Sequence, residues 1–511
     1  MERFVPLAVI ANIVLYHYPF FGYVIDHLNF QNASAYLIFA SIIVALLGVN
    51  LFLFFLMAAL SSKLLKGFLI LSALFNAVAL YFIQTYNVIL GRAMMGNVFN
   101  TRYSEASAYY DPKLLAYLLL LGVIPALIIY KTELKPAKRL RLALLGVASL
   151  LLSILILYLN SFSWLWLDKH AKYLGGLSMP WSYSINALRY EIKKQKKSQR
   201  QKRLPDGKFT DNQKRVVVLV IGESARADHF SLYGYPKPTS PELEKADIIA
   251  LPNTDAAATY TTASVAAILS HKGSTSDNYE PLTSYLHRMG AYVEWRTNNW
   301  GEPKQEVDRY FKSSDLNKEC QGSACKYDMM LLTNLEETIL QNPKKKILIV
   351  LHTAGSHGPS YNQKYPPEFE YFKPVCTTVD LKQCSKEALF NAYDNTIRYT
   401  DYFLAQTIKK LEQLHLPAIM LYISDHGESL GEYNLYLHGT PYAIAPDCQK
   451  RVPFILWESK TFLEERGYQK PYAKKEARYG HHMVFHTILD ALSLDSPLYK
   501  PEWDLLRSNG K

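Results

Sequence analysis

Five long apolar runs lie in the first 160 residues of the chain, and no run of comparable length follows them. A helix that crosses the hydrocarbon core of a membrane needs about 20 apolar residues, with about 17 as the lower limit. The first run is too long and too aromatic for a cleaved signal peptide. The pattern predicts a transmembrane domain over residues 1–160 with five helices, at residues 5–25, 36–60, 67–86, 114–130 and 142–159.

The pattern changes after residue 215, where short β-branched runs alternate with helical periodicity. Residues 215–221, 346–351 and 418–424 read as buried strands of a parallel sheet. Residues 330–341 and 391–414 read as helices between them. Strands alternating with helices predict a soluble, three-layer α/β/α domain over residues 215–511. The mean hydropathy of −0.06 therefore averages two unlike parts.

Charge divides the chain in the same way. The 511 residues carry a formal charge of +11. Residues 1–160 contain 11 Lys or Arg against 5 Asp or Glu, residues 161–214 contain 12 against 4, and residues 215–511 contain 33 against 36. The positive excess lies beside the predicted membrane domain, whereas a nucleic-acid-binding protein would carry it on the folded domain. We therefore expect no nucleic acid partner.

The basic residues in the short loops predict the orientation. Lys63 and Lys66 follow the second run, and Lys131, Lys135, Lys138, Arg139 and Arg141 lie between the fourth and fifth runs. Basic loops stay in the cytoplasm. An odd number of spans then places the N-terminus inside and residues 215–511 outside. Residues 161–214 are interpreted as an interfacial connector, with Trp164 and Trp166 at the head groups and the basic run KKQKKSQRQKR at residues 193–203 against anionic lipid.

All five cysteines lie in the soluble domain. Cys320 and Cys325 form one close pair, and Cys376 and Cys384 form another. Two such pairs in polar loops are typical of disulfides in an oxidising compartment. A zinc ribbon is the alternative, although neither pair has the Cys-x-x-Cys spacing. Cys448 is left over and is expected to be a free thiol.

Polar clusters follow the ends of the predicted strands, where ligands bind in sheets of this type. The first strand leads into Gly-Glu-Ser-Ala-Arg-Ala-Asp-His at residues 222–229, the second into His352 and Gly-Ser-His-Gly-Pro at 355–359, and the third into Asp425-His426-Gly427-Glu428. Carboxylates and imidazoles gathered in this way are typical of a metal site, zinc included. Asp425 and His426 can share one metal only if the chain turns there, which Gly427 permits.

Several of these residues can also have a purely structural role. A single acidic residue at a strand end is more often a helix cap or an ion-pair partner. His481, His482 and His486 are interpreted as polar residues with ordinary hydrogen bonds. Gly-Glu-Ser-Ala-Arg is not a nucleophile elbow, because Arg226 occupies the last glycine position. Thr259, Thr261 and Thr262 are equivalent candidate hydroxyls by position alone.

The sequence resembles the phosphoethanolamine transferases of Gram-negative envelopes, which include the lipid A modifying enzymes of polymyxin resistance and are similar in fold to sulfatases and alkaline phosphatase. The matching segments cover nearly the whole chain; they are GESARADHFSLYGY (222–235), TTASV (261–265), GSHGPSY (355–361), NAYDNTIRYTD (391–401), SDHGESLGE (424–432) and YLHGTP (436–441). Five spans before the soluble domain also fit the family.

The resemblance assigns roles to individual residues. Thr261 stands where the family has its threonine nucleophile, followed by Ser264 and Val265. The motifs imply one zinc ion held by Glu223, Thr261, Asp425 and His426. His357 and His438 bind the substrate phosphate or a second zinc ion, and Glu428 and Asn299 line the pocket. Met95, Asn97, Thr101 and Glu105 match an extracytoplasmic loop that helps to bind the lipid donor, with a plain solvated loop as the alternative.

The sequence also departs from the family pattern. Cysteines that often flank the nucleophile segment are replaced by Ala257 and Ala267, and the usual proline after Ser-Val is Ala266. One family disulfide is therefore missing. A family lysine is offset by one residue at Lys304, so its role stays open.

The resemblance implies transfer of phosphoethanolamine from phosphatidylethanolamine to lipid A or another envelope glycan or protein, through a phosphoethanolamine-threonine intermediate. The expected protein is a zinc-dependent monomer in the inner membrane with a periplasmic catalytic domain. A glycerol-phosphate polymerase or a sulfatase of the same superfamily is the nearer alternative, although no Cys/Ser-x-Pro-x-Arg segment of a sulfatase lies near Thr261. A catalytically dead membrane sensor is the more distant one, but all the motif positions for zinc ligands are filled.

Overall fold

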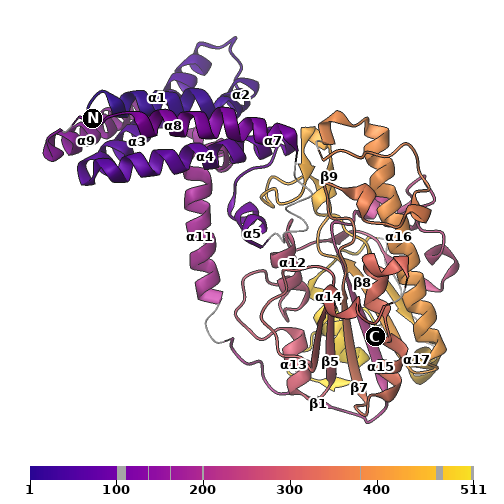
Figure 1. Cartoon of the computed structure of the whole chain (residues 1–511). Coiled ribbons are helices and arrows are strands. Elements are labelled where there is room, and N and C mark those ends of the chain that lie inside the picture. The colour runs from indigo at the N-terminus through magenta and orange to yellow at the C-terminus, as the bar shows by residue number, and fades with distance from the viewer. Residues whose placement is uncertain are drawn as a thin grey trace. The chain divides into compact units, whose positions relative to one another are not determined.

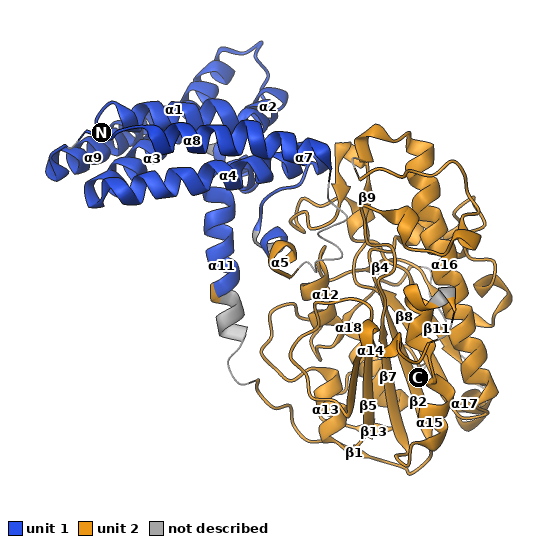
Figure 2. Cartoon of the chain, in the orientation of Figure 1, with its two compact units in different colours: residues 1–95, 109–191 blue, residues 96–108, 192–511 orange. Residues whose placement is uncertain are grey.

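The structure, a computed structural model, describes residues 1–100, 111–135, 137–160, 163–197, 201–320, 322–379, 381–467 and 476–507. The chain divides into two units (Figure 2). Unit 1 comprises residues 1–95 and 109–191, and unit 2 comprises residues 96–108 and 192–511. The expected Thr101 and Glu105 lie outside the described residues.

The first part of the chain is helical, as its long apolar runs predict. Its elements are α1 (Phe4–Tyr16), α2 (Tyr18–Asp26), α3 (Ala33–Leu60), α4 (Ser62–Tyr86), α5 (Arg92–Asn100), α7 (Pro112–Tyr117), the π-helix η1 (Leu118–Val123), α8 (Ile124–Lys131), α9 (Arg139–Leu159), α10 (Ser163–Leu177) and α11 (Trp181–Lys197) (Figure 1). Helix α3 packs against α9, and α4 packs against η1 and α8.

Four helical stretches in the described part of unit 1 are long and apolar enough to cross a membrane: Ala33–Leu60, Ser62–Tyr86, Pro112–Lys131 and Arg139–Leu159. The expected first span, residues 5–25, is instead the pair α1 and α2, bent by 63°. Pro19 lies in the first turn of α2 and cannot continue the hydrogen bonding of α1. The described residues therefore provide four spans, or five if the bent pair crosses as one.

Helices α10 and α11 occupy much of the expected connector, residues 161–214. Residues up to Glu191 group with unit 1. Trp181, at the start of α11, donates a hydrogen bond from Nε1 to Asn50 Oδ1 of α3 at 3.0 Å. Leu174, Leu177 and Met179 are buried in the same apolar cluster as residues of α1, α2, α3 and α4. The expected connector is thus largely a packed part of the helical unit.

Unit 2 is built around a mixed β-sheet. Its strands are β1 (Lys208–Phe209), β2 (Arg215–Gly222), β3 (Ile248–Leu251), β4 (Thr254–Asp255), β5 (Tyr292–Thr297), β6 (Arg309–Lys312), β7 (Lys346–His352), β8 (Ala418–Ser424), β9 (Ser429–Leu430), β10 (Tyr436–Leu437), β11 (Phe454–Glu458), β12 (Tyr479–Gly480) and β13 (Leu494–Asp495). Its α-helices are α12 (Thr261–Ile268), α13 (Leu282–Arg288), α14 (Ser313–Leu316), α15 (Leu335–Gln341), α16 (Lys386–Gln413), α17 (Lys460–Glu465) and α18 (His482–Ala491).

The main sheet has seven strands in the order β3-β11-β8-β2-β7-β5-β6. Strands β2, β5, β6, β7 and β8 run parallel, whereas β11 is antiparallel to both β3 and β8. The three predicted strands and their parallel pairing are thus confirmed, and the antiparallel pairs of the sheet come from strands that the sequence analysis did not name. The three-layer arrangement is confirmed. Alternate residues of β2 face the apolar core shared with α12, α13 and α18, and α16 packs against β8.

The pairing register places the C-terminal ends of β2, β7 and β8 side by side. Gly222 of β2 pairs with Ser424 of β8, and Ile221 pairs with His352 of β7. The residues that follow these strands therefore meet at one edge of the sheet. The predicted helix at 391–414 is confirmed as part of α16. The predicted helix at 330–341 is interrupted, because Asn334 adopts a left-handed conformation with φ of 52° between a 3-10 turn and α15.

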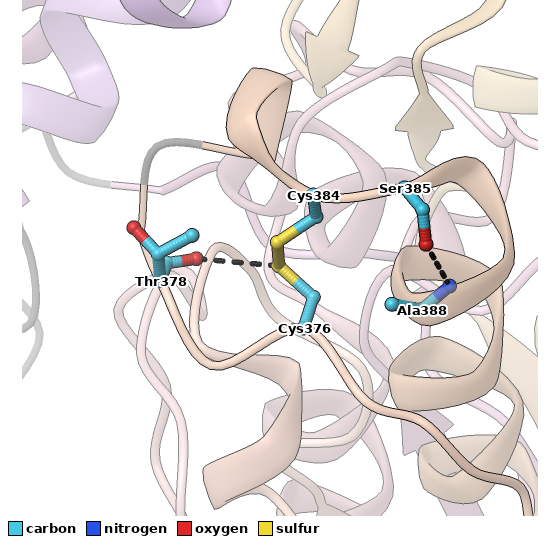
Figure 3. Close-up of a disulfide and its surroundings, with 5 residues drawn as sticks. All are labelled: Cys376, Thr378, Cys384, Ser385 and Ala388. Carbon is cyan, nitrogen blue, oxygen red and sulfur yellow. Dashed lines mark hydrogen bonds between the residues drawn. A yellow bond between two sulfur atoms is a disulfide. The ribbon is translucent and has the colours of Figure 1, made fainter.

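Both expected cysteine pairs are joined. Cys320 is bonded to Cys325, and Cys376 is bonded to Cys384, with 5.7 Å between the Cα atoms in each case. Figure 3 shows the second disulfide just before α16, whose first turn is capped by Ser385. Cys448 is free and half-buried.

Candidate active site

Thr261 is the first residue of α12, and its hydroxyl points into a cluster of polar side chains. Thr261 Oγ1 lies 3.1 Å from Glu223 Oε2, to which it donates a hydrogen bond, and 3.4 Å from His426 Nε2. The exposed N–H groups at the start of a helix favour negative charge nearby. Thr259, by contrast, donates its hydroxyl to Thr440 O at 2.6 Å. The hydroxyls that are equivalent by sequence position therefore differ in what they contact.

Glu223, Asp425 and His426 form the first candidate metal group. Their ligand atoms lie within 4.8 Å of one another, and all three side chains are buried. His426 Nε2 is 3.4 Å from Glu223 Oε1 and 3.2 Å from Asp425 Oδ2. Glu223 follows β2 and Asp425 follows the adjacent β8, so the sheet register itself brings the two carboxylates together.

The two oxygens of Asp425 have different surroundings. Oδ1 accepts hydrogen bonds from the backbone N–H groups of Ser224 and His426, at 3.1 and 2.7 Å. Oδ2 is buried, and among the described residues it has no hydrogen-bond partner. A buried carboxylate oxygen without a donor is costly unless a cation binds it. With a second carboxylate and an imidazole beside it, this donor set fits zinc.

The chain bends immediately after β8, as the sharing of one site by Asp425 and His426 requires. Only glycine fits at position 427, because a Cβ atom there would lie 2.0 Å from Cys448 O. Gly427 N also donates to Gln449 O, and Glu428 N donates to Cys448 O. The segment around Cys448 therefore stabilises the bend through these backbone hydrogen bonds.

Glu223, His357 and His438 form a second candidate metal group, again within 4.8 Å of one another. The rings of His357 and His438 lie 5.3 Å apart, and those of His426 and His438 lie 4.2 Å apart. His438 Nδ1 is 3.1 Å from Glu428 Oε2. Glu223 belongs to both groups and so lies at the centre of the site.

Asn299 orients this central carboxylate. Its Nδ2 donates to Glu223 Oε2 at 2.8 Å and to Thr353 O at 3.0 Å. Lys304 has an exposed side chain, whereas Asn299 is buried. The structure thus brings Asn299 into the cluster together with Glu223, Thr261, His357, Asp425, His426, Glu428 and His438.

Burial dominates the electrostatics of the site. It raises the pKa of Asp425 well above the ordinary value, and the nearby charge of Glu223 raises it further. Burial raises the pKa of Glu428 to about 8. Burial lowers the pKa of His426 to about 4, and the neighbouring His438 lowers it further. Burial also acts to raise the pKa of Glu223, but attraction to the histidines outweighs it and lowers this pKa. A neutral imidazole of His426 beside crowded carboxylates is suited to bind a cation.

Comparison with known proteins identifies the family of the chain. A family model for sulfatases matches residues 215–494, and a model for the phosphoethanolamine transferases EptA/EptB matches residues 47–195. Phosphoethanolamine transferase EptA of Helicobacter pylori is 40% identical over 97% of this chain and 94% of that protein. The chain belongs to the phosphoethanolamine transferase family.

Further likenesses extend over both units of the transferase. EptA of Escherichia coli K12 is 34% identical, over 85% of this chain and 84% of that protein. The integral membrane lipooligosaccharide phosphoethanolamine transferase A of Neisseria meningitidis has a similar structure, with a TM-score of 0.88 and 28% identity over 98% of this chain and 97% of that one. The chain is therefore a multi-pass membrane protein with a sulfatase-like domain.

Two residues that support the site in this transferase were missed by the sequence analysis. Ser224 has a left-handed backbone with φ of 55°, and its hydroxyl donates to Glu223 Oε1 at 2.7 Å. Tyr393 of α16 holds this turn, because its hydroxyl donates to Ser224 O at 2.7 Å and accepts from Arg226 N at 3.0 Å. The motif segment 391–401 was the available signal, since it has polar residues on a buried helix.

The predicted donor-binding loop is described only in part. Asn97 lies on α5, and Met95 is buried in an apolar cluster of unit 1. Glu105 and Thr101 are outside the described residues. The lipid-donor role of Asn97 and Glu105 therefore stays a prediction.

Proposed function

We propose that the protein transfers phosphoethanolamine from phosphatidylethanolamine to an envelope acceptor such as lipid A, with Thr261 as the nucleophile. The observation that carries this proposal is the position of the Thr261 hydroxyl, 3.1 Å from Glu223 and 3.4 Å from His426 at the start of a helix. The acceptor follows from the relatives, one of which is named for lipooligosaccharide.

The proposed cofactor is zinc. Glu223, Thr261, Asp425 and His426 would hold one ion, and His357 and His438 would bind the substrate phosphate or a second ion. Bound zinc favours the alkoxide of a coordinated hydroxyl and stabilises negative charge on phosphoryl oxygens. The unpartnered Asp425 Oδ2 and the raised pKa of Asp425 support this assignment.

The reaction is a double displacement. Thr261 Oγ1 forms a bond to the phosphorus of phosphatidylethanolamine, the bond from phosphorus to the diacylglycerol oxygen breaks, and the Thr261 proton is taken up by His357 or His438. His357 or His438 gives a proton to the departing diacylglycerol. A hydroxyl, phosphate oxygen or amine of the acceptor then forms a bond to the phosphorus of the phosphoethanolamine on Thr261, and its proton is taken up by the same histidine. The bond from phosphorus to Thr261 Oγ1 breaks, and Thr261 Oγ1 receives that proton.

The proposed location follows from the loops and disulfides. The basic loops at Lys63 and at residues 131–141 lie in the cytoplasm with the N-terminus. The two disulfides favour an oxidising compartment for residues 215–511, which in a Gram-negative envelope is the periplasm. We propose a monomer in the inner membrane, with residues 1–160 spanning it and residues 161–214 at its surface.

Mapping the covalent intermediate tests the function. The full-length protein in detergent is incubated with phosphatidylethanolamine, and intact mass and peptide mapping locate the phosphoethanolamine adduct. We expect it on Thr261, absent from Thr261→Ala and retained in Thr262→Ala. An adduct on Thr262, or one that persists in Thr261→Ala, would show that the nucleophile is misassigned. Mass spectrometry of envelope fractions with and without the protein identifies the acceptor.

A further inference from the structure

The segment that leads to Thr261 is held by hydrogen bonds along its backbone. It runs from the end of β4 at Asp255 to the start of α12. Ala256 N donates to Lys450 O at 2.8 Å, and Gly439 N donates to Thr259 O at 2.8 Å. Between these two anchors, Ala257 N donates to Nδ1 of His481 at 3.2 Å. The side chain of His481 thus binds the backbone four residues before the proposed nucleophile.

The other ring nitrogen of His481 reaches the strand that carries the proposed metal ligands. His481 Nε2 lies 3.0 Å from Ser424 O, and Ser424 is the last residue of β8, directly before Asp425 and His426. A carbonyl oxygen only accepts and a backbone N–H only donates, so Nε2 carries the proton and Nδ1 accepts. The ring is 1% exposed and therefore belongs to the interior.

We propose that His481 is a positioning residue for the transfer reaction. Its ring links the Thr261 segment to the end of β8 and so fixes the distance between the nucleophile and Asp425 and His426. His481 binds the backbone N–H of Ala257, and Ala257 stands where the family often has a cysteine. At this position the chain therefore has a hydrogen bond to the Thr261 segment and no disulfide. The inference rests on the proposed function only in taking Thr261 as the nucleophile.

His486, on the helix α18 that begins directly after His481, provides a matched control. Its Nε2 lies 3.0 Å from His271 O, and its Nδ1 accepts from Lys500 N at 3.2 Å. It is as buried as His481 and bridges two backbone groups in the same way. Neither of its partners belongs to the Thr261 segment or to the end of β8. Replacing each histidine by leucine therefore removes the same chemistry from two different places.

The first measurement is steady-state transfer by the full-length protein in detergent. A misplaced reacting group lowers the rate with little effect on substrate binding, so we expect His481→Leu to lower kcat by about 10- to 100-fold with KM for phosphatidylethanolamine unchanged. His486→Leu should keep the wild-type kcat per folded molecule. His481→Gln, whose amide can both accept and donate, should recover most of the rate.

The second measurement does not depend on activity. Hydrogen exchange of residues 253–260 reports whether the Ala257 amide is protected. We expect protection to be lost in His481→Leu and in His481→Phe, neither of which offers an acceptor to the Ala257 N–H, and to be kept in His486→Leu. The phenylalanine variant, whose ring is close in shape to that of histidine, serves if the leucine variant does not fold.

The inference would be overturned by a wild-type kcat in both His481→Leu and His481→Phe, or by unchanged protection of Ala257 in these variants. An equal loss of kcat in His486→Leu would do the same. A wild-type protein that transfers no phosphoethanolamine would instead contradict the proposed function, while the exchange experiment would still decide the role of His481.

Discussion

The two units of the molecule distribute polar and apolar residues in opposite ways. In unit 1, large apolar side chains are exposed, such as Leu140 at 73% and Leu151 at 59%, while Asn50 and Asn76 are fully buried. In unit 2, the central strands β2, β7 and β8 are almost entirely apolar inside, and the buried polar groups gather at their ends. The comparison shows that the solvent around each unit decides which residues lie inside.

Buried polar residues also serve different purposes in the two units. One group inside unit 1 is bonded to itself across helices: Asn76 Nδ2 donates to Asn12 Oδ1 at 3.0 Å, and the Tyr183 hydroxyl donates to Asn76 Oδ1 at 2.9 Å. In unit 2 the cluster at the strand ends keeps Oδ2 of Asp425 without a hydrogen bond among the described residues, 3.2 Å from His426 Nε2. The first network is closed and structural, whereas the second is suited to bind something else.

The largest expected effect comes from removing the charge of Asp425. We expect Asp425→Asn to lower transfer by at least about 1,000-fold, because a metal ligand is lost. In the metal-free protein the same change should raise the melting temperature, since burial and Glu223 both disfavour the ionised Asp425. Metal analysis, transfer assays and thermal unfolding after chelation test this. A lower melting temperature would mean that the strand-end cluster is structural, like the network of unit 1.

A matched pair of exposed leucines tests the difference in solvent directly. Leu151 of α9 is 59% exposed and Leu340 of α15 is 56% exposed. Arginine near the centre of a membrane helix costs about 2.5–3.5 kcal/mol on insertion scales, whereas a surface change in water stays within about 0.5 kcal/mol. Leu151→Arg should therefore reduce the amount of protein recovered in the membrane, and Leu340→Arg should not. Equal recovery would show that α9 does not face lipid.

The Asn76 network should contribute to stability and not to chemistry. Asn76→Leu leaves Asn12 and Tyr183 without their shared partner, so we expect a loss of about 1–2 kcal/mol with kcat unchanged. Tyr183→Phe removes one of the two hydrogen bonds and should cost less. Chemical unfolding in detergent measures both. A large drop in kcat at unchanged stability would assign the network a part in the reaction.

The sequence predicted most of the regular helices and strands, but few of the contacts between residues that are far apart in the chain. The β-branched runs at 215–221 and 418–424 were enough to find adjacent strands, and their register brings Glu223 and Asp425 together. The bend between α1 and α2 was missed although Pro19 marks it. The motif segment 391–401 contains Tyr393, but nothing in it indicates that Tyr393 contacts the left-handed Ser224, 169 residues away. Such contacts arise only when the whole sheet and α16 have packed.

The smallest expected effect concerns two helix caps, one in each unit. Ser61 Oγ accepts from Leu64 N at the start of α4, and Ser385 Oγ accepts from Ala388 N at the start of α16 (Figure 3). Replacing a serine cap by alanine costs about 1 kcal/mol when water can replace the lost bond. Lys63 and Lys66 predict that α4 begins in water, so both caps should behave alike. Hydrogen exchange at Leu64 and Ala388 should accelerate about fivefold in Ser61→Ala and Ser385→Ala, respectively.

A much larger effect at Leu64 would mean that the N–H groups of α4 start inside the hydrocarbon, where each lost bond costs several kcal/mol. The contrast between the units would then extend to their helix ends, and the orientation proposed from the basic loops would be wrong.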